Sequence, residues 1–394
     1  MRFKFLLTFL LATHLFAQPA EQCTAAVIST AVSEGGRPML WKNRDTGRLS
    51  NKVVFVREAP HSYLALVDAE DASGRRAWAG VNDAGFAIMN TASYNLPKKG
   101  GDMEDLEGAV MADALRTCRT LADFEAYLNA NHGPDLGVNT NFGVVDAEGG
   151  AALFETHGRA HVRFNALAAP EKYLVITNFS RSGEPGKGAG YPRFQRATEL
   201  MKTAAVAGPL SVNSLLGALV RDTSHPLLGG PTVQELKNLP ASPKWLHARH
   251  TINRWDTACS VILQGKRPGD PASRPVMWIV PGQPVTAPVL PLFVDAEATP
   301  EVFWKGSEAP LWVESLRIKN LAHSLKGREL EEYLDLARLD NREGTGFLPA
   351  ILKTEYETLE QTETFLKVPR TAEELRIFQK ETAERALAVL KAIK

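Results

Sequence analysis

A cysteine lies where export could make it the first residue of the mature chain. Cys23 follows an apolar segment at residues 5–17 and the short stretch QPAEQ, and the strand-like run CTAAVIST begins with it. If processing removed everything through Gln22, Cys23 would carry both a thiol and a free α-amine. An α-amine with a pKa of roughly 7.7–8.0 can accept the thiol proton near neutral pH. The pattern therefore predicts a nucleophile that carries its own base.

Charged residues follow at the end of a second strand-like run, LWKNRDTG. The stretch SEGGRP between the two runs predicts a hairpin, which would bring Asp45 toward Cys23. A carboxylate there could hold the α-ammonium, and a cation such as Lys42 could lower the pKa of the thiol. Arg44 is expected on the opposite face of the strand from Lys42. The alternative is a charged strand end that faces solvent.

Residues 1–22 have the composition of a secretory signal, with a basic start, an apolar run and a short polar end. The apolar run is too short to span a bilayer well. We expect cleavage after Ala17 or Ala20, an exported protein that is periplasmic or secreted, and no stable membrane insertion once the signal is removed. Whether the bond between Gln22 and Cys23 cleaves itself stays open.

Two other readings of Cys23 remain, a lipidated cysteine and an ordinary buried one. Ala20 and Gln22 fit a lipidation signal poorly, because lipidation favours a small residue directly before the cysteine and an aliphatic residue three before. The chain has three cysteines, too few for a dense disulfide framework. We expect Cys118 and Cys259 in the core, and one bridge between them stays open.

Composition excludes several classes of function. The 394 residues carry 45 Lys plus Arg and 45 Asp plus Glu, so the whole chain presents no basic field for nucleic acid. The glycine-rich SRSGEPGKGAG lacks the Gly-Lys-Ser/Thr ending of a phosphate-binding loop. His247 and His250 are spaced like metal ligands but lack a nearby third ligand, so a surface helix is the preferred reading. We expect no cofactor and no metal.

Hydrophobic patterning predicts an α+β layered sandwich, with two blocks of strands separated by helices. The strand-like segments are 23–30, 38–44, 52–59, 63–69, 76–82, 85–93, 140–158, 161–170, 171–179, 257–265 and 275–284. The helical segments are 107–130, one starting near Arg193, 211–221, 311–325, 329–340 and 371–393. We divide the chain into a signal and short pro-segment (1–22), a strand-rich domain (23–307) and a helical C-terminal extension (308–394).

Several motifs together resemble one family. CTAAVIST followed by GGRPMLWKNRDTG is similar to the start of the N-terminal-nucleophile hydrolases of the choloylglycine hydrolase and isopenicillin-N acyltransferase-like group. In that group a cysteine at the mature N-terminus is followed by a basic-Asn-x-Asp motif. GVNDAGFAIMNTASYN, YLVITNF, GYPRFQRATEL and the pair TACSVIL with VMWIVPGQP resemble later motifs of the group, in the same order. The resemblance covers roughly residues 23–294.

The resemblance implies a four-layer αββα sandwich, here with a helical C-terminal extension, and it implies roles for six residues. Lys42 stands where the family commonly has arginine, and the choice between Arg193 and Arg196 stays open. The implied roles are Cys23 as nucleophile and base, Asp45 as the partner of its amine, Lys42 as the nearby cation, Asn178 as the oxyanion donor, Asn90 as the group that orients amine or substrate, and Arg193 as the distal cation.

The resemblance also implies the reaction, which is cleavage of a linear, non-peptide amide through a thioester. Hydrolysis is favoured over acyl transfer, because acyl-CoA is a cytoplasmic donor and the chain is expected to be exported. The alternatives are an acyltransferase of the same fold, a non-catalytic exported binding protein or lipoprotein and, more weakly, a peptidase. The expected partner is a small-molecule amide of unspecified acyl group and amine, with no nucleic acid. A homo-oligomer is left open.

Overall fold

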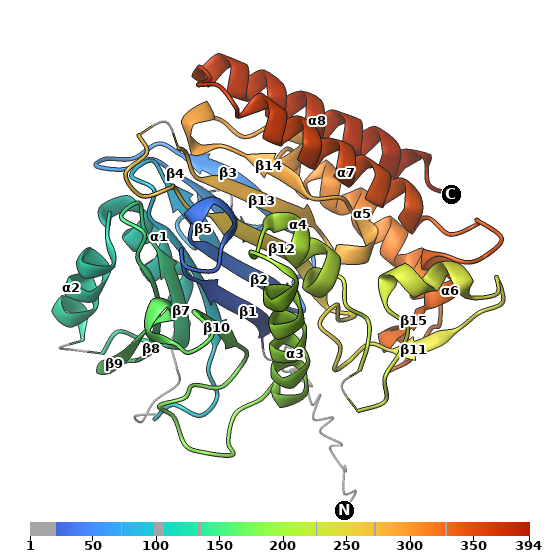
Figure 1. The fold of residues 1–394 in the computed structure, drawn as a ribbon, viewed down its shortest axis with the longest axis horizontal. Coiled ribbons are helices and arrows are strands. Elements are labelled where there is room, and N and C mark those ends of the chain that lie inside the picture. Colours follow the sequence, from blue (N-terminus) through green and yellow to red (C-terminus); the bar gives the residue numbers. More distant parts are fainter. Residues whose placement is uncertain are drawn as a thin grey trace, which may run out of the picture.

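Two stacked antiparallel sheets form the centre of the molecule, and helices cover both outer faces (Figure 1). The computed structural model describes residues 21–71, 73–97, 106–132, 135–225, 227–271, 273–327 and 329–394. The predicted signal and pro-segment, residues 1–22, lies outside this part of the chain except for Glu21 and Gln22.

The first sheet has six strands and contains both Cys23 and Asp45. Its order is β10-β1-β2-β12-β13-β14. The strands are β1 Gln22–Ile28, β2 Met39–Asp45, β10 Tyr173–Ile176, β12 Thr257–Gln264, β13 Val276–Pro281 and β14 Leu290–Leu292. β1, β2 and β12 are buried along almost their whole length, because the sheet is covered on both faces.

The second sheet has seven strands that pair in chain order. The strands are β3 Asn51–Val56, β4 Tyr63–Asp68, β5 Ala79–Asn82, β6 Ala87–Ala92, β7 Asn139–Val145, β8 Ala151–His157 and β9 Ala160–Asn165. Strands β6 and β7 pack against β1 and β2 of the first sheet. The two sheets therefore face one another at these four strands.

Helices complete the outer layers. Helices α1 and α2 contact the seven-stranded sheet, and α3, α5, α7 and α8 contact the six-stranded sheet. The helices are α1 Glu107–Thr117, α2 Leu121–Asn131, α3 Tyr191–Ala207, α5 Pro310–Ala322, α7 Leu348–Phe365 and α8 Ala372–Ala392, with the short helices α4 Val212–Leu215 and α6 Leu336–Leu339. The predicted four-layer αββα sandwich is confirmed, and so is the helical character of the C-terminal region.

The C-terminal helices are part of the packed structure. The indole nitrogen of Trp312, in α5, donates to the carbonyl oxygen of Ala258 in β12 at 2.9 Å. Glu355, in α7, forms a buried ion pair with Arg221 at 2.6 Å. These helices supply much of the outer layer on the six-stranded sheet (Figure 1). The domain boundary at residue 307 stays a prediction.

Three expected helices differ from the prediction. The 107–130 segment is two helices, because Thr120 caps the start of α2 in a reciprocal box with Asp123. The 329–340 segment contains a 3₁₀ turn, the strand β15 (Tyr333–Asp335) and α6, since β15 pairs with β11 (Trp245–His247). The 211–221 segment is α4 followed by a π-helical turn at Leu216–Val220. The described part of the chain has no helix long and apolar enough to cross a membrane.

The predicted hairpin of β1 and β2 is confirmed, and its register decides which residues share a face. Cys23 pairs directly with Arg44, and Gln22 pairs with Asp45. Side chains of directly paired residues lie on the same face, and faces alternate along a strand. Cys23, Lys42 and Arg44 therefore share the face toward the second sheet. The expectation that Arg44 lies opposite Lys42 is wrong, because the two residues are two positions apart and the strand period is two.

Candidate active site

Six buried side chains come together around the start of β1, each at most 2% exposed. They are the six predicted site residues, namely Cys23, Lys42, Asp45, Asn90, Asn178 and Arg193. They come from β1, β2, β6, the segment after β10 and the first turn of α3. The fold thus gathers at one point residues that lie far apart in the sequence.

The backbone nitrogen of Cys23 is held by a side chain. It donates a hydrogen bond to Oδ1 of Asn178 at 2.9 Å. This nitrogen is a peptide nitrogen, since Gln22 precedes it, and it cannot act as a base in this form. Burial raises the pKa of the Cys23 thiol to about 11, although the Lys42 charge lowers it. With Gln22 attached, the thiol is therefore protonated near neutral pH.

Arg193 joins Asn178 to the backbone of Cys23. Its Nη2 donates to Oδ1 of Asn178 at 2.8 Å, and its Nη1 donates to the carbonyl oxygen of Cys23 and to Oγ1 of Thr24. Arg196, one helical turn later, pairs instead with Asp222 at 2.8 and 3.0 Å. The structure places Arg193 among the other predicted site residues and Arg196 away from them, and the role of Arg193 stays a prediction.

Asp45 lies on the other face of β2, among two guanidinium groups. Its Oδ1 accepts from the hydroxyl of Thr257 at 2.7 Å. Its Oδ2 lies 3.8 Å from Nη1 of Arg193 and 3.7 Å from Nε of Arg254, and no hydrogen-bond donor reaches it among the described residues. Burial raises the pKa of Asp45 to about 7, opposed by the two arginines. One carboxylate oxygen is thus available to a new donor.

Lys42 reaches across to the second sheet. Its Nζ donates to Oδ1 of Asn90 at 2.7 Å and to the carbonyl oxygen of Trp78 at 3.0 Å. Burial lowers the pKa of its ammonium, and the nearby Cys23 raises it. Asn90 therefore enters the site as the group that holds Lys42. Its implied role of orienting the amine or the substrate stays a prediction.

Glu21 and Gln22 directly precede Cys23 and contact three arginines around it, and we call them the leader residues. Oε1 of Glu21 lies 2.7 Å from Nη2 of Arg44, and Oε1 of Gln22 accepts from Nη2 of Arg193 at 2.9 Å and from Nη1 of Arg254. The leader residues therefore lie on both faces of the sheet at the start of β1, with Glu21 at Arg44 and Gln22 at Arg193 and Arg254.

Sequence reasoning missed three polar residues of the site, Thr257, Arg254 and Tyr94. Thr257 is the first residue of the strand-like run TACSVILQG. A polar residue at the start of a predicted core strand is a sequence signal that could have identified it. Arg254 and Tyr94 lie between strands. Only tertiary packing brings these two to the leader residues.

The other cysteines and histidines do not extend the site. Cys23, Cys118 and Cys259 are free and buried, so the bridge that the sequence left open is not formed. His247 lies in β11, not in a surface helix, and its Nε2 is 2.8 Å from Oε2 of Glu332. Within the described ranges, no three His, Cys, Asp or Glu side chains are grouped as metal ligands.

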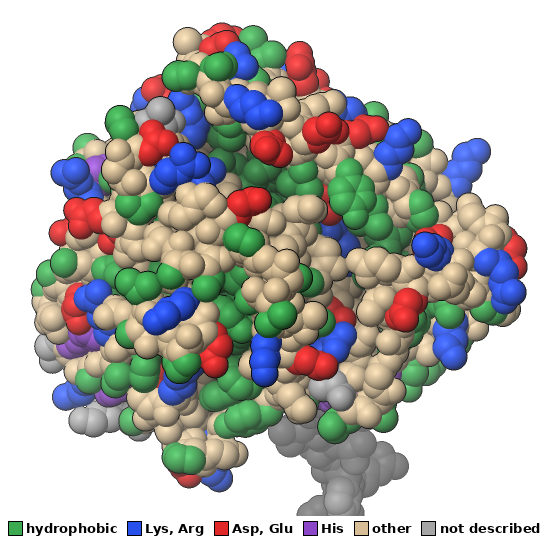
Figure 2. Space-filling model, in the orientation of Figure 1, with side chains coloured by type: hydrophobic (Ala, Val, Ile, Leu, Met, Phe, Trp, Pro, Cys, Tyr) green, Lys and Arg blue, Asp and Glu red, His purple; other side chains and the backbone are tan. Residues whose placement is uncertain are grey.

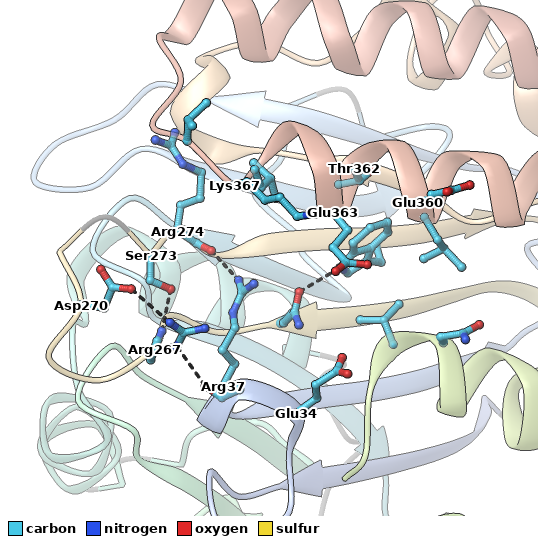
Figure 3. Close-up of a pocket in the computed structure, with 18 of the residues that line it drawn as sticks. Glu34, Arg37, Arg267, Asp270, Ser273, Arg274, Glu360, Thr362, Glu363 and Lys367 are labelled. Carbon is cyan, nitrogen blue, oxygen red and sulfur yellow. Dashed lines mark hydrogen bonds and ion pairs between the residues drawn. The ribbon is translucent and has the colours of Figure 1, made fainter. Parts of the chain in front are cut away.

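A separate cavity of about 780 Å³ opens at the other end of β2, between the β1–β2 turn and α7 (Figure 3). Arg37 projects into it and donates from Nε to the carbonyl oxygen of Gly265 at 2.8 Å. Cys23 lies at the opposite end of β1 and does not line this cavity. On the face drawn in Figure 2, basic and acidic side chains are interspersed.

Comparison with known proteins gives similarity to solved structures only. No family model and no curated protein sequence matches the chain. A Caenorhabditis elegans ortholog of N-acylethanolamine-hydrolyzing acid amidase is 15% identical, with 64% of this chain and 95% of that chain covered and a TM-score of 0.40. A penicillin V acylase from Agrobacterium tumefaciens is also 15% identical, with 69% of this chain and 86% of that chain covered and a TM-score of 0.40.

A conjugated bile acid hydrolase from Clostridium perfringens is also similar, at 9% identity, with 66% of this chain and 89% of that chain covered and a TM-score of 0.39. These identities and TM-scores do not assign an activity to this chain. The αββα architecture accordingly rests on the strand order and layer contacts of the chain itself.

Proposed function

We propose that this chain is an exported amidohydrolase of the N-terminal-nucleophile type, in which Cys23 cleaves a linear, non-peptide amide. The observation that carries the proposal is the environment of the Cys23 backbone nitrogen. Asn178 accepts its hydrogen bond at 2.9 Å, and Arg193 holds both Asn178 and the Cys23 carbonyl. Every buried backbone N–H needs an acceptor, but here the acceptor is a side-chain oxygen that a buried guanidinium also holds, and this oxygen could equally accept from an amine.

Removal of the leader residues would change the chemistry of Cys23. The peptide nitrogen would become an amine, and the thiol would be opened to substrate and water. The Oδ2 atom of Asp45, which lacks a hydrogen-bond donor among the described residues, could then hold the protonated amine. The motif order that resembles the N-terminal-nucleophile hydrolases supports this reading of the same residues.

The proposed reaction has two stages. The amine takes the thiol proton, Sγ attacks the amide carbonyl carbon, and the ammonium gives its proton to the leaving nitrogen as the C–N bond breaks. The acyl group is then bound to Sγ as a thioester. Water attacks this thioester, its proton passes through the amine to the departing sulfur, and the carboxylic acid leaves.

Two side chains are assigned supporting roles in these stages. The Lys42 ammonium favours the thiolate by its charge, as it already lowers the pKa of the thiol in the uncleaved chain. The amide nitrogen of Asn178 is assigned as a donor to the oxyanion of the tetrahedral intermediate. In the uncleaved chain this nitrogen donates to the carbonyl oxygen of Ala92 at 3.0 Å.

The test combines the mass of the mature chain with labelling of its thiol. The full-length chain is produced in a host that exports it, and its N-terminal sequence and intact mass are measured. We expect a chain that starts with unmodified Cys23 and reacts with a thiol-directed amide-hydrolase probe. The Cys23→Ala variant should lose all labelling and all amide hydrolysis. The matched variant Cys118→Ala, which changes a buried cysteine at the end of α1, should keep both.

Other outcomes contradict the proposal in distinct ways. A mature chain that begins at Gln18 or Glu21, or that carries a lipid on Cys23, leaves no free amine and excludes the mechanism. Faster transfer of the acyl group to an added amine than to water would make the chain an acyltransferase.

A further inference from the structure

The leader residues mark the acyl side of the proposed site. If Cys23 attacks the carbonyl carbon of Gln22, the segment that ends in Gln22 becomes the acyl group on Sγ. The acyl group of any later substrate is attached to the same sulfur atom. Side chains that bind the leader residues are therefore positioned to bind a substrate's acyl group, and this inference rests on the proposed function.

Arg44 binds the carboxylate of Glu21 through Nη2, for which the described part of the chain provides no other acceptor. Its Nη1 donates to Asn51 at 2.6 Å and to Asp68 at 2.8 Å. Its Nη2 reaches Oε1 of Glu21 at 2.7 Å, and its Nε has no hydrogen-bond partner among the described residues. The guanidinium is fully buried, whereas Glu21 is partly exposed at 24%. Within the described residues, the Nη2 of Arg44 thus has its hydrogen-bond acceptor in the leader alone.

Departure of the leader would leave an excess of positive charge at this place. Asp68 is shared between Arg44 and Arg48, whose Nη1 lies 3.1 Å from Oδ2 of Asp68. One carboxylate then faces two guanidinium groups. A buried charge that loses its partner is costly, so the vacated position favours another anion.

Arg44 is also held rigidly enough to recognise a defined group. Its guanidinium lies over the ring of Trp78, 4.6 Å from the ring centre, in addition to its bonds to Asn51 and Asp68. A pre-positioned guanidinium loses little freedom on binding a carboxylate, and it binds with a fixed geometry.

The arginines near Gln22, Arg193 and Arg254, do not need a new anion when the leader departs. Arg254 already forms two bonds to Asp256, at 2.8 and 3.1 Å, and Arg193 lies beside Asp45. Their charges therefore have carboxylate neighbours without the leader. Tyr94 offers a further donor beside the leader. Its hydroxyl donates to the carbonyl oxygen of Glu21, so it could bind another acceptor once the leader has gone.

We propose that Arg44 forms an acyl-binding subsite that selects substrates whose acyl group carries a carboxylate. The carboxylate takes the place of the Glu21 side chain. A neutral acceptor, such as an amide carbonyl between the carboxylate and the scissile carbonyl, takes the place of the Glu21 carbonyl oxygen at Tyr94. The substrate class is thus an N-acyl amide with an anionic, amide-containing acyl group.

The test compares two chromogenic amides on the mature protein, obtained from the full-length chain in a host that exports it. N-acetyl-Glu-Gln-p-nitroanilide carries the acyl group of the leader, and N-acetyl-Gln-Gln-p-nitroanilide differs only by a neutral amide in place of the carboxylate. We expect kcat/KM to favour the glutamyl substrate by about tenfold or more, the range of one hydrogen bond to a charged group. A second readout is protection of Cys23 from iodoacetamide by the two corresponding dipeptide acids, which should show the same order.

Two variants assign the preference to Arg44. Arg44→Gln should remove it, while Arg48→Gln should keep it, because Arg48 pairs with the same Asp68 but does not contact Glu21. If Arg44→Gln does not fold, Arg44→Lys should reduce the preference while it retains the charge. Equal values for the two substrates and the two acids in the unmodified protein would overturn the inference and leave the proposed function intact. Failure of Cys23 to react with iodoacetamide or with either substrate would overturn both.

Discussion

The backbone nitrogen of Cys23 and the side-chain oxygen of Asn178 are joined by a hydrogen bond of 2.9 Å between residues 155 positions apart in the chain. The same oxygen accepts from Arg193, and the amide nitrogen of Asn178 donates to Ala92. Asn178 is therefore an acceptor toward the nucleophile and a donor on its other side. This division of roles permits each to be tested separately.

Substitution of Asn178 should separate its two roles. Asn178→Ala should lower kcat by about 10²–10³-fold, as expected for loss of an oxyanion donor. Asn178→Asp keeps an oxygen for the Cys23 nitrogen and Arg193 but loses the donor. A similar loss in both variants, measured by steady-state hydrolysis of an amide, would support the oxyanion role. Near-normal kcat in Asn178→Asp would show that only the acceptor matters.

Replacement of Lys42 should make the nucleophile less acidic. Because the Lys42 charge lowers the pKa of the Cys23 thiol, Lys42→Met should raise that pKa. The pH at half-maximal alkylation of Cys23 by iodoacetamide should therefore shift upward. Lys52→Met is the matched control, since Lys52 is also buried and donates to a backbone carbonyl, that of Gly306, at 2.9 Å. An equal shift in both variants would contradict a specific role for Lys42.

The two arginines of α3 should differ in their importance. Arg193→Lys should lower kcat/KM by about 100-fold, because lysine cannot bind Asn178, Thr24 and the Cys23 carbonyl together and the nucleophile would be displaced. Arg196→Lys should leave catalysis nearly unchanged, since Arg196 pairs with Asp222. Steady-state kinetics of the two variants makes the comparison, and comparable losses would argue for a general effect on the helix.

Asp45 should make the uncleaved chain less stable as the pH rises. Its pKa is 3.8 in the reference state and about 7 in the folded chain, so between these values the folded state retains a proton that the unfolded state has released. Stability conferred by the protonated carboxyl is present at low pH and is lost as the pH approaches 7. Asp45→Asn removes this dependence.

The measurement uses Cys23→Ala as background, and intact mass selects preparations in which the leader residues are still attached. Urea unfolding of Cys23→Ala and of Cys23→Ala with Asp45→Asn is compared across this pH range. The free-energy difference in favour of the second variant should grow by on the order of 1 kcal/mol per pH unit and then level off. A difference that does not change with pH would contradict the raised pKa.

The ion pair of Arg221 and Glu355 should tie the C-terminal helices to the rest of the fold. Both residues are nearly fully buried, and they form two bonds of 2.6 and 2.8 Å. Glu355→Gln should lower the free energy of unfolding by about 3–5 kcal/mol, because it leaves a buried guanidinium unpaired. Glu301→Gln, in an exposed pair with Lys305, should cost about 1 kcal/mol or less. Denaturant unfolding of the two variants measures both, and equal costs would contradict the prediction.

The sequence alone determined the local parts of this protein. The apolar runs predicted the strands of both sheets except β14, and SEGGRP predicted the hairpin that places Asp45 beside the start of β1. These features depend on neighbours in the chain, namely on side-chain alternation and on turn residues. The same alternation places Arg44 with Lys42, and the expectation that separated them was an error in applying that rule.

Tertiary structure decided the rest of the site. Arg193 and Arg196 occupy successive turns of one helix, and only the packing of α3 on β1 distinguishes them. Arg254 and Tyr94 reach the leader residues from segments between strands, and Asn51 and Asp68 of the seven-stranded sheet hold Arg44 beside Glu21. Such contacts depend on how distant elements pack together and on which side-chain rotamers that packing allows. The spacing of residues along the chain determines neither.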